Sequence, residues 1–282
     1  MTAISVIIPV WNRADRIRHA IESALTQELS GASLEILVID DGSSDDLADA
    51  LRGCKVSCIR HDRNRGAAAA RNTGIEAARG DYVAFLDSDD VWLSGKLAAQ
   101  IAFMQTNGYL ASCTSYYLSR KNSPEIISPA YPSGLLSLSD LAWGCFVSPG
   151  STLVCARSVF SEIDGYDVTL QRLEDWDWLL RFARTRPLGF LARPLARIAA
   201  SGYTDVAKIA TALERVRQRH SSALDPVNRR HFEAAIALEH AAAHYRAAHY
   251  ASAFVAMLKS LCLAPTGHVA LRAIMHNRSA GA

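Results

Sequence analysis

Short apolar runs alternate with helix-forming stretches through the first hundred residues, and this alternation limits the fold more than any other feature. The runs are apolar at consecutive positions, which is typical of strands buried on both faces of a sheet. The stretches between them carry apolar residues at helical spacing, such as Leu97, Ile101 and Met104. We therefore predict an α/β fold with a mostly parallel, Rossmann-like sheet flanked by helices. The predicted strands are ISVIIPV (4–10), LEILVID (34–40), VSCIRH (56–61) and YVAFLD (82–87).

The remaining sequence changes character at about residue 204. Before it we expect strands at ASCTSYYLS, STLVCA and LGFLA, a helix at EDWDWLLRFART, and a loop rich in Pro, Ser and Gly over residues 121–148. Beyond it nearly the whole chain is helix-forming, with breaks at Pro226 and near Tyr250. We predict an α/β domain over residues 1–204 and a helical C-terminal appendage over residues 205–282.

Composition indicates an ordinary globular protein. Half of the 282 residues are hydrophobic and 21% are charged. No stretch reaches the roughly 18 apolar residues of a membrane span, and the first residues lack the basic region of a signal peptide. The six cysteines are scattered without a CxxC pair, which favours reduced thiols. We expect a cytoplasmic protein.

The net charge of +2 is unevenly distributed. Residues 205–282 hold ten Lys/Arg and five Asp/Glu, whereas the rest of the chain holds 20 and 23. A basic amphipathic segment can dock on an anionic bilayer, so peripheral contact with the inner membrane face is one expectation. Packing on the α/β domain or an oligomer contact is an equal alternative. His240 and His244 have a spacing that can bind zinc, but no third ligand is evident, so solvated histidines are favoured.

Polar residues follow three of the predicted strands, at the edge where open α/β sheets bind ligands. The densest group ends the fourth strand, where three carboxylates within four positions need a counter-charge. A solvated turn or helix cap would explain one Asp, whereas bound Mg²⁺ or Mn²⁺ would explain three. Trp92 stands where an EF-hand loop requires Gly, and no GxxxxGK[ST] loop is present. The residues at these strand ends are Pro9, Asn12, Asp40, Asp41, Asp87, Ser88, Asp89 and Asp90.

Four segments resemble, in order and spacing, the motifs of family 2 glycosyltransferases. They are SVIIPVWNR (5–13), ILVIDDGSSDD (36–46), NRGAAAARNTGIEAARGDYVAFLDSDD (64–90) and EDWDWLLR (174–181). The resemblance covers roughly residues 3–200 and implies an inverting enzyme of the GT-A fold. It implies a nucleotide-diphospho-sugar as donor, most often a UDP-sugar, and a saccharide or lipid-linked acceptor in the synthesis of surface polysaccharide or lipid-linked oligosaccharide. Nucleic acid is not an expected partner.

The same resemblance implies roles on the donor side. Pro9 and Asn12 match the loop that borders the nucleotide. Asp41, with Asp40 beside it, matches the carboxylate that accepts the N–H of the base, and helix capping is the alternative for this pair. Arg71 matches a residue near the diphosphate, where a guanidinium can bind two oxygens. A surface position on a helix is the alternative for Arg71.

The remaining matches concern the metal and the acceptor. Asp87 and Asp89 form a DxD motif with Ser88 between them, in which Asp87 leans on the ribose and both carboxylates hold Mn²⁺ or Mg²⁺. Glu174 and Asp175 match the acidic pair that begins a late helix, and Asp175 would be the general base for the acceptor hydroxyl. The neighbouring Trp176 and Trp178 are predicted as core residues.

One departure weakens the metal assignment. Many family members carry a His after the last strand, whereas residues 195–205 contain none. Ser201, Tyr203 or water would take its place. The rival interpretation is therefore a catalytically silent protein that binds nucleotide-sugars or serves assembly with the same fold. The sugar, acceptor, linkage and metal are not specified by the sequence.

Overall fold

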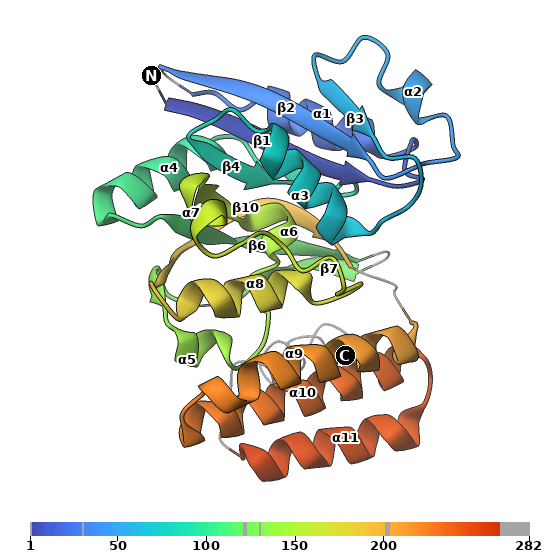
Figure 1. Cartoon of the computed structure of the whole chain (residues 1–282), viewed down its shortest axis with the longest axis vertical. Coiled ribbons are helices and arrows are strands. Elements are labelled where there is room, and N and C mark those ends of the chain that lie inside the picture. Colours follow the sequence, from blue (N-terminus) through green and yellow to red (C-terminus); the bar gives the residue numbers. More distant parts are fainter. Residues whose placement is uncertain (1, 30, 121–122, 130, 201–203, 266–282) are drawn as a thin grey trace. The chain divides into compact units, whose positions relative to one another are not determined.

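The structure is a computed structural model that describes residues 2–29, 31–120, 123–129, 131–200 and 204–265 (Figure 1). Contacts group the chain into two compact units. The first comprises Met1–Leu135, Val147–Val168 and Pro187–Ala199, and the second comprises Leu136–Phe146, Thr169–Arg186 and Ala200–Ala282. Two segments that precede residue 204 thus belong with the C-terminal helices, which differs from the division at that residue predicted above.

The first unit is built on a mixed, mostly parallel sheet, which confirms the predicted α/β class. Its strand order among the described residues is β3-β2-β1-β4-β9-β6-β10-β5, with β7 paired to β6 and β8 to β10. The strands are β1 (Thr2–Val10), β2 (Ala32–Asp40), β3 (Ser57–Arg60), β4 (Tyr82–Phe85), β5 (Val91–Trp92), β6 (Ala111–Arg120), β7 (Ser123–Ser128), β8 (Gly134–Leu136), β9 (Val154–Ala156) and β10 (Leu188–Ala199).

The chain order around β1 creates a topological switch point. Strand β1 pairs in parallel with β2 on one side and with β4 on the other, and β2 pairs in parallel with β3. The chain therefore runs outward from β1 to β3 and then returns to the opposite side of β1. The loops that follow β1, β2 and β4 leave the sheet at the same edge, where such a reversal opens a crevice.

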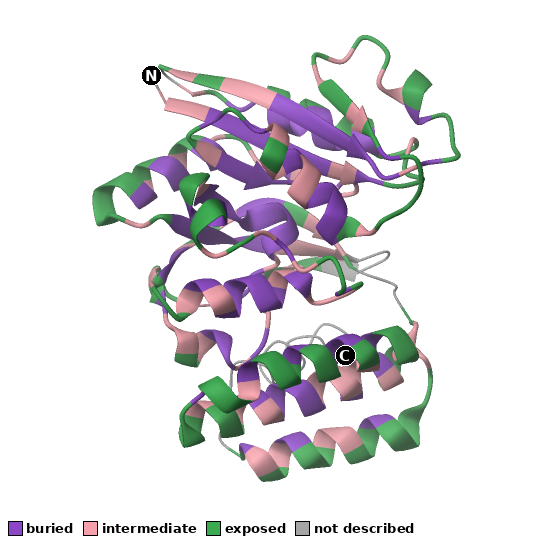
Figure 2. Ribbon diagram, viewed as in Figure 1, coloured by how far each residue is buried: buried purple, intermediate pink, exposed green. Residues whose placement is uncertain are grey.

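Helices cover both faces of this part of the sheet. Val6, Ile7 and Ile8 of β1 are fully buried, as expected for a strand with two covered faces. Ile7 packs so closely on α3 that a β-carbon at Gly74 would lie 2.4 Å from Ile7 Cγ2. The buried positions appear as purple segments in Figure 2. The helices of this unit are α1 (Ile17–Leu25), α2 (Leu47–Ala50), α3 (Ala67–Ala77), α4 (Lys96–Asn107), α6 (Pro149–Thr152) and α7 (Ser158–Glu162).

One local prediction is wrong. The segment predicted as a loop over residues 121–148 contains β7, β8 and α5 (Leu138–Leu141). Strand β7 forms a hairpin with β6, and this pairing outweighs the low strand propensity of its Ser and Pro residues.

The second unit is helical. It contains α5, α8 (Glu174–Ala183), α9 (Val206–His220), α10 (Pro226–Arg246) and α11 (Tyr250–Leu263), with a 3₁₀ turn at Ser221–Ala223. The breaks predicted at Pro226 and Tyr250 are confirmed. Pro226 stands in the first turn of α10, where its missing N–H costs nothing, and Asp225 caps that turn. None of the described helices is long and apolar enough to cross a membrane.

Helix α8 packs within this second unit. The rings of Trp176 on α8 and Phe232 on α10 have centroids 5.3 Å apart, and the Trp176 Nε1–H donates to the Leu141 carbonyl at 2.8 Å. The Trp178 ring is fully buried and stacks on Phe182. Both tryptophans are therefore core residues, as predicted. The helix that carries Glu174 and Asp175 shares its core with the C-terminal helices.

Candidate functional site

The loop after β1 is joined to the loop after β2 by Asn12. The Asn12 backbone N–H donates to Ser43 Oγ at 3.0 Å, and its side-chain Oδ1 accepts the Ser44 N–H at 2.7 Å. Asn12 has a φ of 50°, a left-handed conformation that Asn tolerates better than most residues. Pro9 lies one residue before the end of β1. The side chain of Trp11, between Pro9 and Asn12, is 52% exposed.

Asp40 is buried and anchors the same loop. Its Oδ1 accepts the Ser43 N–H at 2.8 Å, and its Oδ2 accepts from Arg60 Nη1 at 2.7 Å. The Arg60 Nη2 also donates to the Ser43 carbonyl at 2.7 Å. Both carboxylate oxygens of Asp40 thus hold the turn that follows β2.

Asp41 is equally buried and has three donors. Its Oδ1 accepts from His61 Nδ1 at 2.7 Å and from the Arg65 N–H at 2.9 Å, while its Oδ2 accepts the Gly66 N–H at 2.7 Å. The other His61 nitrogen, Nε2, lies 2.9 Å from Thr73 Oγ1. A carboxylate offers about four lone-pair positions, so one remains at Asp41 for a further donor.

Asp87 at the end of β4 is paired with Arg71 of α3. The Arg71 Nη2 donates to Asp87 Oδ1 at 2.8 Å, and the guanidinium lies 5.6 Å from the centre of the Tyr166 ring. Arg71 is only 5% exposed, which rules out the surface alternative. Gly150 of α6 packs against the same carboxyl, since a β-carbon there would lie 2.3 Å from Asp87 Oδ2 and 3.1 Å from Arg71 Nη2.

The rest of the DxD segment is held in two different ways. Asp90 is buried, and it accepts from Ser151 Oγ at 2.5 Å and from the Ala199 N–H at 2.9 Å. Burial raises the pKa of Asp90 well above its ordinary value, and the charge of Asp87 raises it further. The Asp87 N–H donates to Ser151 Oγ at 3.0 Å, so one hydroxyl links both ends of the segment. Asp89 has a looser partner, Arg13, whose Nη2 lies 3.7 Å from Asp89 Oδ2.

These contacts change the explanation of the carboxylate cluster. Arg71 and Arg13 supply positive charge beside Asp87 and Asp89, and two hydrogen-bond donors satisfy Asp90. These protein groups therefore offset part of the repulsion among the three carboxylates, for which a bound metal was the predicted counter-charge.

The carboxylates nevertheless fit a hard divalent cation. The side chains of Asp87 and Asp89 are 38% and 29% exposed. Mg²⁺ sites commonly use one or two carboxylates and complete their shell with water and substrate phosphates. Within the described part of the chain, no group of three or more His, Cys, Asp or Glu side chains could hold a metal. Ser201 and Tyr203, the predicted substitutes for the missing His, lie outside the described residues.

Glu174 and Asp175 begin α8 in the second unit. Glu174 is buried and Asp175 is half-buried, with its Oδ1 accepting the Trp176 N–H at 2.8 Å. Leu173, directly before them, has a φ of 64°, a strained conformation for a bulky residue. Such strain often accompanies functional positions, since the surrounding structure must enforce it.

Buried charges fix α8 to α9. Asp177 Oδ1 lies 2.9 Å from Arg219 Nη1 and 2.8 Å from His220 Nε2, and its Oδ2 accepts from Arg181 Nε at 2.9 Å. Although burial opposes ionisation, the hydrogen bond from His220 and the neighbouring arginines lower the pKa of Asp177 to about 2. Arg184 Nη2 lies 3.0 Å from the other His220 nitrogen, Nδ1. Arg can only donate and ionised Asp can only accept, so His220 is neutral with its proton on Nε2.

Several of these residues were not singled out from the sequence. His61, Gly150 and Ser151 contact the candidate donor-side aspartates from positions 20 to 64 residues away in the chain. Arg13 lies inside the SVIIPVWNR motif, and its charge beside a polar loop was a usable signal. The structure brings Asn12, Asp40, Asp41, Arg71 and Asp87 to one edge of the sheet. Asp175 belongs to the second unit, in the first turn of α8.

Comparison with known proteins agrees with this geometry. The model of glycosyl transferase family 2 matches residues 5–163, which is more than half of the chain. The chain belongs to this family. The match includes every candidate donor-side residue and ends before Glu174.

Curated relatives carry related sequence over part of their length. An uncharacterised glycosyltransferase of Rickettsia conorii is 35% identical over 210 residues, which are 72% of this chain and 34% of that protein. The UDP-Glc:alpha-D-GlcNAc-diphosphoundecaprenol beta-1,3-glucosyltransferase WfaP of Escherichia coli is 41% identical over 123 residues, or 43% of this chain and 48% of that protein. The chain thus matches from a third to a half of these relatives.

Solved structures share the GT-A fold. Residues 1–349 of Staphylococcus aureus TarS in complex with UDP superimpose with a TM-score of 0.60 at 16% identity, covering 92% of this chain and 88% of that one. A mannosyltransferase from Pyrobaculum calidifontis in complex with GDP-Man and Mn²⁺ gives 0.59 at 19% identity, covering 95% and 80%. At such low identity the likeness establishes the fold alone.

Proposed function

We propose that this protein is an inverting glycosyltransferase that moves a sugar from a nucleotide-diphospho-sugar to a hydroxyl acceptor. The observation that carries the proposal is the convergence of Asn12, Asp41, Arg71 and Asp87 at the switch point of a family 2 sheet. This is the edge at which open α/β sheets bind nucleotides.

The donor is proposed to be a UDP-sugar. The loops that carry Asn12 and Asp41 border the base, with the remaining lone pair of Asp41 accepting its N–H. The exposed indole of Trp11 offers a flat surface on which a base can stack. Structural neighbours bound to UDP and to UDP-GlcNAc support this choice, whereas the neighbour bound to GDP-Man supports a different base.

A divalent cation is proposed to bind with the donor. Asp89 would be its main protein ligand, because both oxygens of Asp87 already face Arg71 or Gly150. Mn²⁺ and Mg²⁺ both suit these oxygen donors, and a neighbour of the same fold holds Mn²⁺. When bound, the cation would offset the negative charge that develops on the departing nucleoside diphosphate. The Arg71 guanidinium would contribute to the same task.

Asp175 is proposed as the general base. Its carboxylate would take the proton of the acceptor hydroxyl while that oxygen attacks the anomeric carbon and the bond to the diphosphate breaks. A single displacement inverts the anomeric centre, so no covalent intermediate on the protein is needed. Glu174 beside it would help to bind the acceptor. The neutral His220, Arg181 and Arg219 hold Asp177, and thereby α8, in a fixed place within the second unit.

The acceptor is proposed to be a saccharide linked through diphosphate to a lipid, in the synthesis of a surface polysaccharide. Two relatives from Escherichia coli carry names that specify transfer to alpha-D-GlcNAc-diphosphoundecaprenol. A third, from Bacillus subtilis, is named as a putative enzyme of teichuronic acid biosynthesis. A peripheral contact of the basic C-terminal helices with the membrane would bring the protein to such an acceptor.

Calorimetric titration of UDP, GDP and dTDP, with Mn²⁺ and then with EDTA, tests the donor side. We expect UDP to bind more tightly than the other two and to weaken by at least about tenfold on chelation. Asp89→Asn should remove most of the metal dependence, whereas the exposed control Asp49→Asn should not. No binding of any nucleotide with metal present would refute the proposed donor site.

Turnover separates an enzyme from a silent binding protein of the same fold. Asp175→Asn should retain UDP affinity and lose transfer by roughly 10²–10⁴-fold, the usual contribution of a general base. The anomeric configuration of the product should be inverted, as a nuclear magnetic resonance spectrum of the product would reveal. A wild-type protein that binds UDP with metal but transfers no sugar to any diphosphate-linked acceptor would favour the silent alternative.

A further inference from the structure

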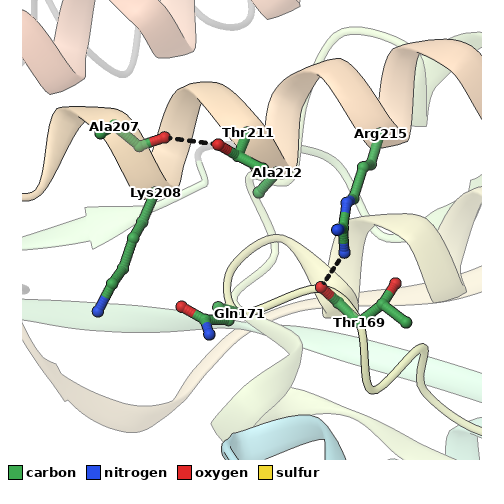
Figure 3. Close-up of a pocket in the computed structure, with 7 residues that line it drawn as sticks. All are labelled: Thr169, Gln171, Ala207, Lys208, Thr211, Ala212 and Arg215. Carbon is green, nitrogen blue, oxygen red and sulfur yellow. Dashed lines mark hydrogen bonds between the residues drawn. The ribbon is translucent and has the colours of Figure 1, made fainter.

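A cavity of about 300 Å³ lies in the second unit between α9 and the segment that leads into α8 (Figure 3). This volume is at the lower end of the range for small-ligand sites. The helix contributes Lys208 and Arg215, and the segment contributes Thr169 and Gln171, three residues before Glu174. The remaining lining residues are Ala207, Thr211 and Ala212.

The cavity is built for negative charge. Figure 3 shows Lys208 and Arg215 extending from one side of α9 toward Gln171 and Thr169. Lys208 lies in the first turn of a 15-residue helix, where the helix dipole also favours an anion. Residues 205–282 have a net charge of +5, in agreement with an anionic partner.

Two side chains that line the cavity, Arg215 and Gln171, keep hydrogen-bond donors for a ligand. Arg215 uses Nη1 to donate to the Thr169 carbonyl, which leaves other guanidinium N–H groups. The Gln171 side chain makes no hydrogen bond within the described residues and is exposed. The Thr211 hydroxyl already donates to the Ala207 carbonyl at 2.9 Å, so this side chain lines the cavity without offering its proton to a ligand.

The nearby acidic groups do not cancel this charge. Asp205 Oδ2 lies 3.8 Å from Lys208 Nζ, but the Asp205 carboxylate also caps α9 by accepting the Lys208 N–H at 3.0 Å. The Lys208 side chain is 54% exposed, so its contact with Asp205 is weak. Glu214 is engaged by Arg217 and Gln218.

The shape favours an elongated anion. Lys208 and Arg215 are seven residues apart, which corresponds to about 10 Å along the helix axis. Two phosphates in a row can contact both cations, whereas a single phosphate can contact only one of them closely. All the described donor-side residues belong to the first unit, whereas this cavity shares a unit with α8 and Asp175.

We propose that the cavity lined by Thr169, Gln171, Lys208 and Arg215 binds the diphosphate of the acceptor substrate. This proposal rests on the proposed glycosyl transfer to a diphosphate-linked saccharide. The cavity would hold the charged part of the acceptor while Glu174 and Asp175, at the start of α8, act on its sugar. Lys208 and Arg215 are then residues that determine acceptor specificity.

Nuclear magnetic resonance of the full-length ¹⁵N-labelled chain tests the binding step without turnover. Inorganic pyrophosphate titrated in EDTA buffer should shift the amides of residues 169–171 and 205–215 in a saturable way. Lys208→Glu should weaken this binding by about tenfold or more, while Lys259→Glu should change it by less than about twofold. The control makes the same charge change at an exposed site on α11 that does not line the cavity. Arg215→Gln should also weaken binding, and its amide keeps a donor for the Thr169 carbonyl.

Three outcomes of this titration would overturn the proposal. They are shifts confined to the surroundings of Arg71 and Asp87, equal affinity in Lys208→Glu and wild type, and inorganic phosphate binding as tightly as pyrophosphate. The last result would indicate a general phosphate site.

A transfer assay then separates the diphosphate of the acceptor from other sources of phosphate. With a GlcNAc diphosphate carrying a short alkyl chain, Lys208→Glu should raise KM by about tenfold or more and leave kcat nearly unchanged. With octyl GlcNAc, which has no phosphate, the variant and the wild type should have the same KM. An equal rise for both acceptors would refute the assignment. Failure of the wild type to use either acceptor would instead count against the proposed function, because the pyrophosphate titration reports on the cavity independently.

Discussion

Gly150 lies against the carboxyl group of Asp87 so closely that a β-carbon at position 150 would be 2.3 Å from Asp87 Oδ2. Gly150→Ala should therefore push Asp87 away from Arg71 and weaken UDP binding by about tenfold, at a stability cost of about 1–3 kcal/mol from overpacking. Titration calorimetry and thermal unfolding measure the two effects.

Gly189→Ala is the matched control. A β-carbon there would lie 2.6 Å from Tyr109 Cδ2, so the substitution also overpacks the first unit, but away from Asp87. It should lower stability to a similar extent and leave UDP affinity unchanged. Equal losses of affinity in both variants would indicate a general effect of destabilisation.

Ser151 supplies one hydroxyl to both ends of the DxD segment. Ser151→Ala removes the donor to the buried Asp90 and the acceptor of the Asp87 N–H. Two hydrogen bonds are lost together and a buried carboxyl group is left with one partner fewer, so we expect a loss of about 2–3 kcal/mol in the free energy of unfolding. Ser115→Ala removes a neutral bond from a similarly buried Ser to the Pro129 carbonyl and should cost about 1 kcal/mol. Urea denaturation of both variants compares the values, and a smaller loss at Ser151 would contradict this account.

Lys96 makes stability depend on pH near neutrality. It is fully buried in the first unit, with Nζ donating to Gln100 Oε1 at 2.8 Å and lying 4.4 Å from the Trp92 ring centre. Burial lowers the pKa of Lys96 to about 7. The unfolded chain, with its higher lysine pKa, binds more protons between pH 7 and 9, so stability should rise with pH there by up to about 1.4 kcal/mol per unit.

Replacement of this amine tests the assignment. In Lys96→Met the free energy of unfolding should no longer rise with pH between pH 7 and 9, as measured by urea denaturation at several pH values. Lys259→Met, at an exposed position, should retain this rise. A slope that persists in Lys96→Met would show that another group carries it.

His220 and Asp177 make stability fall in acid. Burial lowers the pKa of His220 despite its bond to Asp177, so the unfolded chain takes up this proton first as the pH drops below about 6.5. The pKa of Asp177 in the folded chain is about 2, so the stability that its ionised carboxylate contributes is lost later, as the pH falls from about 4 to 2. His220→Gln keeps a donor for Asp177 and an acceptor for Arg184 but does not titrate. This variant should therefore lose less of its free energy of unfolding than the wild type as the pH falls from 7 to 5. The remaining loss should come from His231 and His240, whose pKa values burial also lowers.

The sequence was sufficient for the parts of the fold that local pattern determines. The consecutive apolar residues of β1 and the carboxylates after β4 predicted the sheet and the edge at which we propose that the donor binds. The S-x-x-D capping box at Ser137 and Asp140 was a local signal for α5 that the composition of residues 121–148 concealed. Strand β10 extends to Ala199, well past LGFLA, because irregular pairing with β6 accommodates Pro194.

Other site residues could not be predicted because their partners are distant in the chain. Asp41 and His61 are 20 residues apart, and Asp90 and Ser151 are 61 apart. Only the folded sheet brings them together, and single-sequence patterns do not encode such pairs. The grouping of α8 with the C-terminal helices has the same cause, since it depends on Trp176, Phe232 and the buried charge of Asp177.

The interleaving of the two units in the chain has a consequence for biosynthesis. Helix α8 leaves the ribosome before Arg219, His220 and Phe232, the residues that neutralise Asp177 and cover Trp176. Domains generally fold in the order of their synthesis. The N-terminal strands can pair early, but the start of α8 with Glu174 and Asp175 must wait for α9 and α10. A nascent chain stalled before α9 would therefore have its donor-side residues in place and its proposed base still unanchored.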